Sequence, residues 1–224
     1  FDRLKKNAFA ITNRDDKNGM VMVQNTRSHI YTYSTRSLAD FKGIILEEGF
    51  DGMLLSINNQ EVFVPLIGRF NTSNLLAIYG TAVSLGFDKT EVLRVLSTLE
   101  AVNGRFETIH SPKGWTAVVD YAHTPDALEN VLKTVRGFAK GRVVAVFGCG
   151  GDRDNTKRPI MGKTASSLAD FCIITSDNPR TEEPMDIINE ILPGITGEHI
   201  VIENRKEAIR YAIENAQKDD VIIL

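Results

Sequence analysis

Residues 142–180 have the sequence RVVAVFGCGGDRDNTKRPIMGKTASSLADFCIITSDNPR, and this stretch decides the fold class. Two apolar runs, VVAVF at 143–147 and FCIIT at 171–175, lie on either side of a predicted helix that follows Pro159. Apolar runs without alternation are typical of strands that are covered on both faces, as in parallel sheets. The order strand, helix, strand therefore predicts a βαβ unit with a right-handed crossover.

Both apolar runs end in polar residues. Cys149-Gly150-Gly151 and a series of charged residues follow the first run, and Ser176 to Arg180 follow the second. The carboxyl ends of parallel strands meet at one edge of a sheet, and ligands of open α/β proteins bind outside that edge. We therefore expect the functional site where these two segments meet.

The alternation of strands and helices extends over the whole second half of the chain. We expect strands at 105–110, 115–120, 142–147, 171–175, 200–202 and 221–224, and helices at 125–139, 159–169, 184–192 and 206–217. Strands that alternate with helices of this length predict an α/β domain with a Rossmann-like, mostly parallel sheet.

The first hundred residues have a different pattern. Short β-type runs fill residues 20–65, and Asn58-Asn59 separates two of them as a hairpin turn would. Two helical patterns follow. This change of pattern near Asn103-Gly104 predicts two domains in an α/β chain, residues 1–103 and residues 104–224.

Capping residues mark the two predicted helices of the first domain. Asn71 is a candidate N-cap of the first helix, and Gly86 is a natural residue to follow its last turn. Asp88, with Glu91 three residues later, has the spacing of a capping box at the start of the second helix.

Composition excludes several classes of protein. The 224 residues are 42% apolar and 25% charged, with a net charge of −3 that gives no field favouring nucleic acid or an anionic membrane. Two cysteines, Cys149 and Cys172, are too few for a disulfide framework or a metal cluster. The sequence shows no signal peptide and no apolar run of about 18 residues, so we expect a cytoplasmic protein with no membrane or nucleic-acid partner.

Both ends of the sequence suggest a piece of a longer protein. Phe1 is not an initiator residue, and the predicted strand Val221-Ile222-Ile223-Leu224 has no turn after it. We therefore expect further domains in the complete protein.

Gly162-Lys163-Thr164 has the last three residues of a P-loop, but the remainder of the motif is missing. The first glycine of a P-loop lies five residues before the second, and Lys157 occupies that position here. The segment also falls inside a predicted helix rather than between a strand and a helix. We reject it as a nucleotide-binding P-loop.

The glycines at 148, 150 and 151 have two interpretations. They form either a tight turn after the strand or a place where the backbone approaches a ligand, with Arg153, Lys157 or Arg158 as a cation beside it. Both interpretations remain open from the residues alone.

Asp177-Asn178-Pro179-Arg180 also has two interpretations. A turn with a local ion pair would use these residues. An amino-acid head group would match them as well, since its ammonium suits a carboxylate and its carboxylate suits a guanidinium.

The segment from Asp120 to Asp126 follows the predicted strand at 115–120 and precedes a helix. Thr124 is a good N-cap and Pro125 suits the first turn. Asp120 and His123 indicate contact with a ribose or a phosphate, and capping alone is the alternative.

Five stretches together resemble the Mur ligase family of peptidoglycan synthesis. They are GRFNTSN (68–74), NGRFE (103–107), VVDYAHTPDAL (118–128), GCGGDRDNTKRPIMG (148–162) and TSDNPRTEEP (175–184). The match extends over nearly the whole chain. Residues 177–180 are similar to the DNPR motif of the members that add meso-diaminopimelate, whereas lysine-adding members usually lack its arginine.

The resemblance implies an ATP-driven amide ligase that uses Mg²⁺. Its substrates would be ATP, meso-diaminopimelate and a UDP-muramoyl dipeptide whose D-glutamyl carboxylate is activated as an acyl phosphate, and it would act as a monomer. Arg153, Asp177, Asn178, Pro179 and Arg180 would bind diaminopimelate. Asn71 and Asn74 would lie near the adenine, Arg105 near the phosphates, and Asp120 and His123 near the ribose-phosphate end of ATP.

Several parts of the family pattern are missing from the 224 residues. The UDP-sugar domain, the P-loop, the carbamylated lysine and a Gly-Lys-Gly-His-Glu segment are absent, so residues 1–103 resemble the second half of the central ATPase domain. We expect this piece alone to be inactive, and none of its residues is assigned a catalytic or metal-binding role.

Two other readings remain. One is a related ligase, either a lysine-adding Mur ligase or a folylpolyglutamate or cyanophycin synthetase. The other is a non-catalytic Rossmann-like module that binds an amino acid or a nucleotide.

Overall fold

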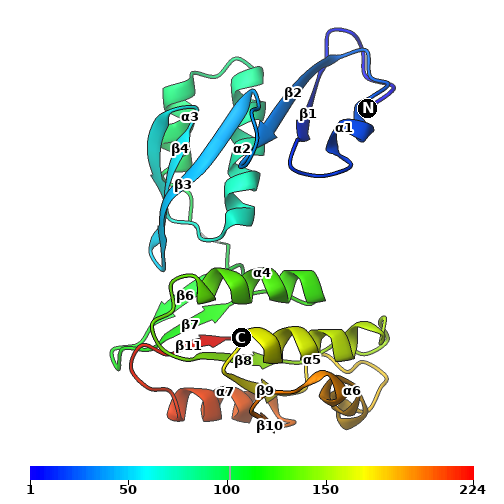
Figure 1. The fold of residues 1–224 in the computed structure, drawn as a ribbon, viewed down its shortest axis with the longest axis vertical. Helices are drawn as coiled ribbons and strands as arrows, with labels where there is room; N and C mark the ends of the chain where they lie inside the picture. Colours follow the sequence, from blue (N-terminus) through cyan, green and yellow to red (C-terminus); the bar gives the residue numbers. More distant parts are fainter. Residues whose placement is uncertain (101) are drawn as a thin grey trace. The chain divides into compact units, whose positions relative to one another are not determined.

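The structure, a computed structural model, describes residues 1–100 and 102–224. Two compact units divide the chain, Phe1–Ala101 and Val102–Leu224, and each is described by itself (Figure 1). The family expectation of an α/β fold is confirmed, since both units combine helices with a sheet that contains parallel strands.

The first unit has a five-stranded mixed sheet in the order β1-β2-β3-β4-β5. Its strands are β1 (Phe9–Asn13), β2 (His29–Ser34), β3 (Phe41–Gly49), β4 (Gly52–Ile57) and β5 (Gln60–Val64). The first three pair in parallel, and β3, β4 and β5 pair antiparallel. Asn58 and Asn59 join β4 to β5 with φ angles of +46° and +67°, so the predicted hairpin turn is confirmed.

The helices of this unit are α1 (Gly19–Met22), α2 (Arg69–Ser84) and α3 (Lys89–Leu96). Leu75, Leu76 and Tyr79 of α2 are buried against the sheet. Gly80 lets α2 come close to β3, because a Cβ atom there would lie 2.5 Å from the ring of Phe41.

The predicted caps are partly confirmed. Asp88 accepts a hydrogen bond from the Glu91 N–H (3.0 Å) at the start of α3, and Gly86 follows α2 with a φ of +95°. The prediction for Asn71 is wrong, because the N-cap of α2 is Gly68, three residues earlier, and the helix begins at Arg69. Asn71 lies within the first turn, and its side-chain amide donates to the Ile67 carbonyl (2.8 Å).

The second unit has a six-stranded sheet in the order β10-β9-β8-β11-β7-β6. Its strands are β6 (Glu107–His110), β7 (Thr116–Val119), β8 (Val143–Phe147), β9 (Phe171–Ile174), β10 (His199–Val201) and β11 (Val221–Ile223). All neighbours pair in parallel except β6 and β7, which confirms the prediction of a mostly parallel sheet.

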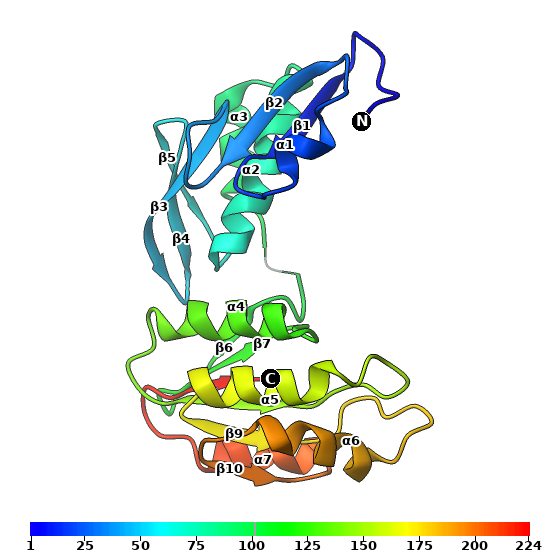
Figure 2. The same ribbon diagram turned by 45° about the vertical axis from the view of Figure 1, so that its right-hand side comes forward.

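Helices connect these strands in alternation. They are α4 (Pro125–Arg136), α5 (Lys157–Leu168), α6 (Pro184–Ile191), the 3₁₀ turn η1 (Leu192–Gly194) and α7 (Arg205–Glu214). Ala208 and Ala212 of α7 pack against Val144 and Val146 of β8. Figures 1 and 2 show α4 and α5 side by side, in agreement with their direct packing.

Gly162-Lys163-Thr164 lies inside α5, so the rejection of a P-loop is confirmed. The helix itself begins at Lys157, two residues before the predicted start.

The two cysteines are buried, unpaired thiols. Burial raises the pKa of Cys149 to about 11 and that of Cys172 to about 12. Both are therefore neutral core residues near pH 7.

Among the described residues, no helix combines the length and the apolar character needed to cross a membrane.

Candidate functional site

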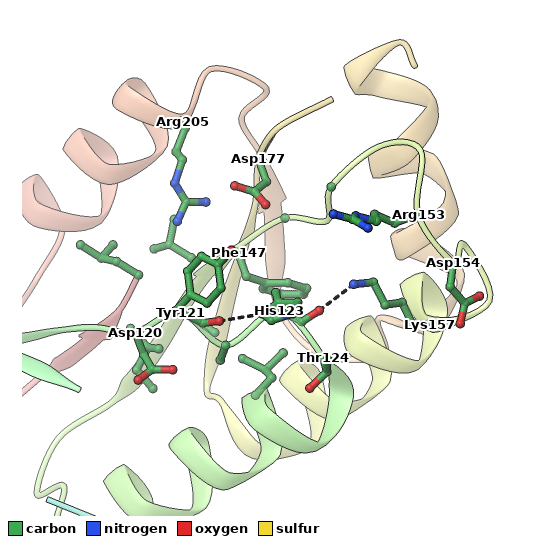
Figure 3. Close-up of a pocket in the computed structure, with 18 of the residues that line it drawn as sticks. Asp120, Tyr121, His123, Thr124, Phe147, Arg153, Asp154, Lys157, Asp177 and Arg205 are labelled. Atoms are coloured by element: carbon green, nitrogen blue, oxygen red, sulfur yellow. Dashed lines mark hydrogen bonds between the residues drawn. The ribbon is translucent and has the colours of Figure 1, made fainter. Parts of the chain in front are cut away.

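A pocket of about 580 Å³ lies at the carboxyl ends of the strands in the second unit (Figure 3). The segments that follow β7, β8 and β9 line it, together with the end of β11 and Arg205 at the start of α7. This is the edge where ligands of open α/β sheets bind, and the volume is in the range of small-molecule sites.

Asp120 and His123 line the pocket immediately after β7. Thr124 accepts a hydrogen bond from the Ala127 N–H (3.3 Å) and Pro125 occupies the first turn of α4, so the predicted cap is confirmed. Two contacts hold His123: its Nδ1 lies 3.0 Å from the Tyr121 carbonyl, and the Lys157 ammonium donates to the His123 carbonyl (2.7 Å).

Asp120 is half-buried, and its side chain accepts a hydrogen bond from the Phe106 N–H (2.9 Å). Burial raises the pKa of Asp120 above its ordinary value, although the Phe106 N–H and the nearby Arg105 act in the opposite direction. A desolvated carboxylate of this kind favours a polar or cationic ligand group beside it, since that group would restore lost hydrogen bonds.

Arg105 lies beside this corner rather than in the pocket lining. Its guanidinium lies 4.6 Å from the centre of the Tyr121 ring, in a cation–π contact. Tyr121 itself lines the pocket, so Arg105 is one side chain away from the site.

Two loops form the other side of the pocket. We call residues 148–156, after β8, the glycine loop, and residues 175–183, after β9, the DNPR loop. The Gly151 N–H donates to the Asn178 carbonyl (2.8 Å), and Arg180 Nη1 donates to the Gly151 carbonyl. The segments that the sequence predicted to meet are therefore in direct contact.

The glycines serve this contact between loops. A Cβ atom on Gly151 would lie 1.9 Å from the Pro179 carbonyl oxygen, and one on Gly148 would lie 2.1 Å from that of Thr175. The tight-turn interpretation thus accounts for Gly148 and Gly151, because the neighbouring loop fills the space beside them. Gly148 and Gly150 also line the pocket, so an approach of this backbone to a ligand stays a prediction.

Arg153, Asp177 and Arg180 line the pocket, and Figure 3 shows the side chains of the first two. Among the described residues, no hydrogen bond or ion pair holds the Arg153 guanidinium. Asn178 and Pro179 are not among the lining residues; their carbonyls accept hydrogen bonds from the Gly151 and Glu182 N–H groups.

Arg158 is not available to a ligand, contrary to one expectation. Its side chain is 1% exposed and donates to both carboxylate oxygens of Glu182 (2.8 Å each) and to Glu190 (3.0 Å). Hydrogen bonds from Arg158 and from the Asp152 N–H lower the pKa of Glu182 to about 2.

Asn71 and Asn74 lie on α2 of the first unit, where the side-chain amide of Asn74 donates to that of Asn71 (3.4 Å). Both residues belong to the first unit and the pocket to the second, so their expected place near the adenine stays a prediction.

Sequence reasoning missed Arg205. It is the first residue of α7, follows the N-cap Asn204, and lines the pocket across from Arg153 and near Asp177 (Figure 3). The available signal was its position just after the predicted strand at 200–202, because such residues lie at the same sheet edge.

The pocket lining thus combines carboxylates with cations. Asp120 and Asp177 supply negative charge, and Arg153, Lys157 and Arg205 supply positive charge. This arrangement suits a ligand with both ammonium and anionic groups. Among the described residues, no group of three or more His, Cys, Asp or Glu side chains is placed to hold a metal ion.

The fold and this site place the chain in a known class: it belongs to the Mur ligase family. Residues 104–224 match the Mur ligase glutamate ligase domain, and residues 1–82 match the Mur ligase middle domain. The family resemblance expected from the sequence is confirmed.

Several relatives of this chain share the same protein name. The chain is 59% identical to the UDP-N-acetylmuramoyl-L-alanyl-D-glutamate--2,6-diaminopimelate ligase of Phocaeicola vulgatus, over 100% of this chain and 48% of that protein. It is 58% identical to the ligase of the same name from Bacteroides thetaiotaomicron, with the same coverage. A solved structure of a ligase with this name is 37% identical, with a TM-score of 0.65 over 96% of this chain and 47% of that one. The chain thus spans about half the length of the relatives it matches.

Proposed function

We propose that the complete protein joins meso-diaminopimelate to UDP-N-acetylmuramoyl-L-alanyl-D-glutamate in an ATP-driven reaction of peptidoglycan synthesis. The observation that carries the proposal is the grouping of Asp177, Arg153 and Arg180 around one pocket at the carboxyl edge of the sheet. A carboxylate beside two guanidinium groups matches an amino acid with an additional carboxylate. The name shared by relatives that are 58–59% identical supports this choice of substrate.

Diaminopimelate differs from lysine by its distal carboxylate. In the proposed complex, Arg153 and Arg180 bind that carboxylate and Asp177 binds the ammonium beside it. A charge-assisted contact of this kind contributes about 1.5–3 kcal/mol. Lysine would leave the guanidinium groups without an anion, and a site built for a polar group rejects an analogue that lacks it by roughly 10⁴-fold.

Asn178 and Pro179 would act through the backbone in this proposal. Their carbonyls fix the DNPR loop against the glycine loop and against Glu182. They therefore shape the diaminopimelate site without lining it.

The ATP assignments rest on the resemblance and on the surroundings of the residues. Asp120 and His123 line the pocket next to Lys157, whose ammonium suits a phosphate, and Arg105 lies behind Tyr121. Asn71 and Asn74 would contact the adenine from the first unit. ATP would supply the phosphoryl group that activates the D-glutamyl carboxylate.

This chain's residues would then hold the amine of diaminopimelate for attack on the acyl phosphate and keep its carboxylates paired. Orientation of a reactant in this way contributes a large part of the rate of a two-substrate reaction. Mg²⁺ usually binds through one or two carboxylates together with phosphate oxygens. Among the described residues, no group of three or more His, Cys, Asp or Glu side chains could hold it alone.

The proposal includes action in the cytoplasm, as a monomer, on small-molecule substrates. The substrates and the monomeric state are what the resemblance implies.

Titration calorimetry on the complete protein tests the proposal. With a non-hydrolysable ATP analogue and the UDP-muramoyl dipeptide present, meso-diaminopimelate should bind and L-lysine should bind far more weakly. Equal affinity for the two amino acids would contradict the role of the arginines, and no binding of either would favour a different ligand class.

A further inference from the structure

We propose that Arg158 and Glu182 are positioning residues that clamp the glycine loop to the DNPR loop and thereby place Arg153 and Arg180 for the amino-acid substrate. The substrate part of this inference rests on the proposed function. The clamp itself rests on contacts between loops that come from different strands.

The first part of the clamp is the buried guanidinium of Arg158. It lies in the first turn of α5, just after the glycine loop, and its Nη2 donates to the Gly150 carbonyl (3.3 Å). The same nitrogen and Nη1 both donate to Glu182 of the DNPR loop. The Arg158 side chain therefore donates hydrogen bonds to both loops.

The second part is Glu182, whose side chain is 31% exposed. Glu182 Oε1 accepts one hydrogen bond from Arg158 Nη2 and a second from the Asp152 N–H (2.5 Å). Asp152 in turn accepts from the Thr181 hydroxyl (2.6 Å). Glu182 thus bonds to the backbone of the residue directly before Arg153, and it lies two residues after Arg180.

The backbone of both loops shows why a clamp is needed. Asp152 and Arg180 have φ angles of +51° and +52°, in the left-handed region that residues other than glycine rarely adopt. Such a conformation persists where the surroundings over-determine it, and it is frequent at ligand sites. The Glu182 side chain supplies that constraint at Asp152, and the Glu182 N–H closes a turn across Arg180 by donating to the Pro179 carbonyl (3.0 Å).

Glu190 provides an internal comparison. It accepts from Arg158 Nη1 (3.0 Å), but it lies on α6 and belongs to neither loop. If pairing with Arg158 were the whole role of the cluster, Glu190 and Glu182 would be equivalent. In the clamp, Glu182 is the carboxylate that joins the loops.

The test uses the complete enzyme with Glu182→Gln, Glu182→Asp and Glu190→Gln, and with Glu129→Gln as a charge-matched control. Glu129 forms a surface ion pair with Lys133 on α4, outside both loops. Steady-state KM values for meso-diaminopimelate, ATP and the UDP-muramoyl dipeptide are measured, together with hydrogen exchange of the Gly151 and Asp152 amides.

Glu182→Gln should raise the KM for meso-diaminopimelate on the order of 10- to 100-fold, because small displacements of positioning groups have effects of this size. The KM for the dipeptide should change less than threefold, roughly the scatter between independent sites. The Gly151 and Asp152 amides should exchange faster. Glu182→Asp should recover part of the loss, and Glu190→Gln should have a smaller effect than Glu182→Gln.

An unchanged KM for meso-diaminopimelate in Glu182→Gln would overturn the proposal, and so would an equal rise in all three KM values. A wild-type enzyme without diaminopimelate-dependent turnover would refute the proposed function instead. Hydrogen exchange would then test the clamp by itself. Faster exchange of the Gly151 and Asp152 amides in Glu182→Gln supports the clamp, and unchanged exchange overturns it.

Discussion

Replacement of Arg153 by alanine isolates the contact between the pocket and the distal carboxylate of diaminopimelate. Arg153 is exposed, lines the pocket and has no hydrogen bond or ion pair within the described part of the chain. Its removal therefore breaks no hydrogen bond or ion pair among the described residues. The free energy of unfolding should change by less than about 0.5 kcal/mol, as for other surface substitutions.

The expected loss of affinity follows from the type of contact removed. A charge-assisted hydrogen bond contributes about 1.5–3 kcal/mol, and 1.4 kcal/mol corresponds to a factor of ten. Arg153→Ala should therefore weaken meso-diaminopimelate binding about 10- to 150-fold. Binding of L-lysine should stay the same, since lysine has no distal carboxylate, and the preference between the two should shrink.

Calorimetric titration of the complete enzyme with each amino acid measures both quantities. Arg153→Lys keeps the charge without the planar fork and should give an intermediate loss. Arg210→Ala is the control, because Arg210 pairs with Glu207 on the exposed side of α7. The reasoning is refuted if Arg153→Ala leaves diaminopimelate affinity intact or weakens lysine binding by the same factor.

Three further outcomes are expected. Arg180→Ala should weaken diaminopimelate binding and also lower the melting temperature, because Arg180 holds the Gly151 carbonyl; a melting temperature equal to that of wild type would contradict this contact. Asp220→Asn should destabilise the protein by about 1.5–3 kcal/mol at pH 7 in denaturant unfolding, since the 3% exposed carboxylate loses charge-assisted hydrogen bonds while its partner Arg142 (2.6 Å) is 45% exposed and regains water. Burial raises the pKa of Asp220, but hydrogen bonds from Arg142 and Gln217 outweigh it and the pKa is lowered. This stabilisation is present above pH 3.8 and is lost as the pH falls through the lowered pKa, so a constant difference down to pH 2 would refute it. Cys149, with a pKa of about 11, should react with a thiol reagent at pH 7 far more slowly than free cysteine; reaction at the rate of free cysteine would contradict its burial.

Local sequence rules predicted much of the fold. The apolar runs of β8 and β9, the Asn58-Asn59 turn and the cap at Asp88 each depend on residues that are close in the chain. Strand and helix order then gave the parallel sheet and the edge at which the pocket lies.

The remaining features depend on contacts between distant segments. The burial of Arg158 requires Glu182 and Glu190, which are 24 and 32 residues away. The need for glycine at 151 comes from the Pro179 carbonyl of another loop. No short pattern in the sequence contains these partners. The sequence alone therefore suggested that Arg158 is an exposed cation available to a ligand.

The start of α2 shows the same limit at a smaller scale. Asn71 has a side chain suited to capping, but the chain enters the helix at Gly68 with a φ of +98°. The Gly68 N–H donates to Glu48 of β3 (2.7 Å), a contact from 20 residues away, and this fixes where the helix begins.

Phosphate release by the complete enzyme tests the central claim most directly. With ATP, Mg²⁺ and the UDP-muramoyl dipeptide present, meso-diaminopimelate should trigger release and L-lysine should not. Release with lysine at the same rate would contradict the assignment of Arg153 and Arg180 to the distal carboxylate, and release with neither amino acid would contradict the proposed ligase reaction.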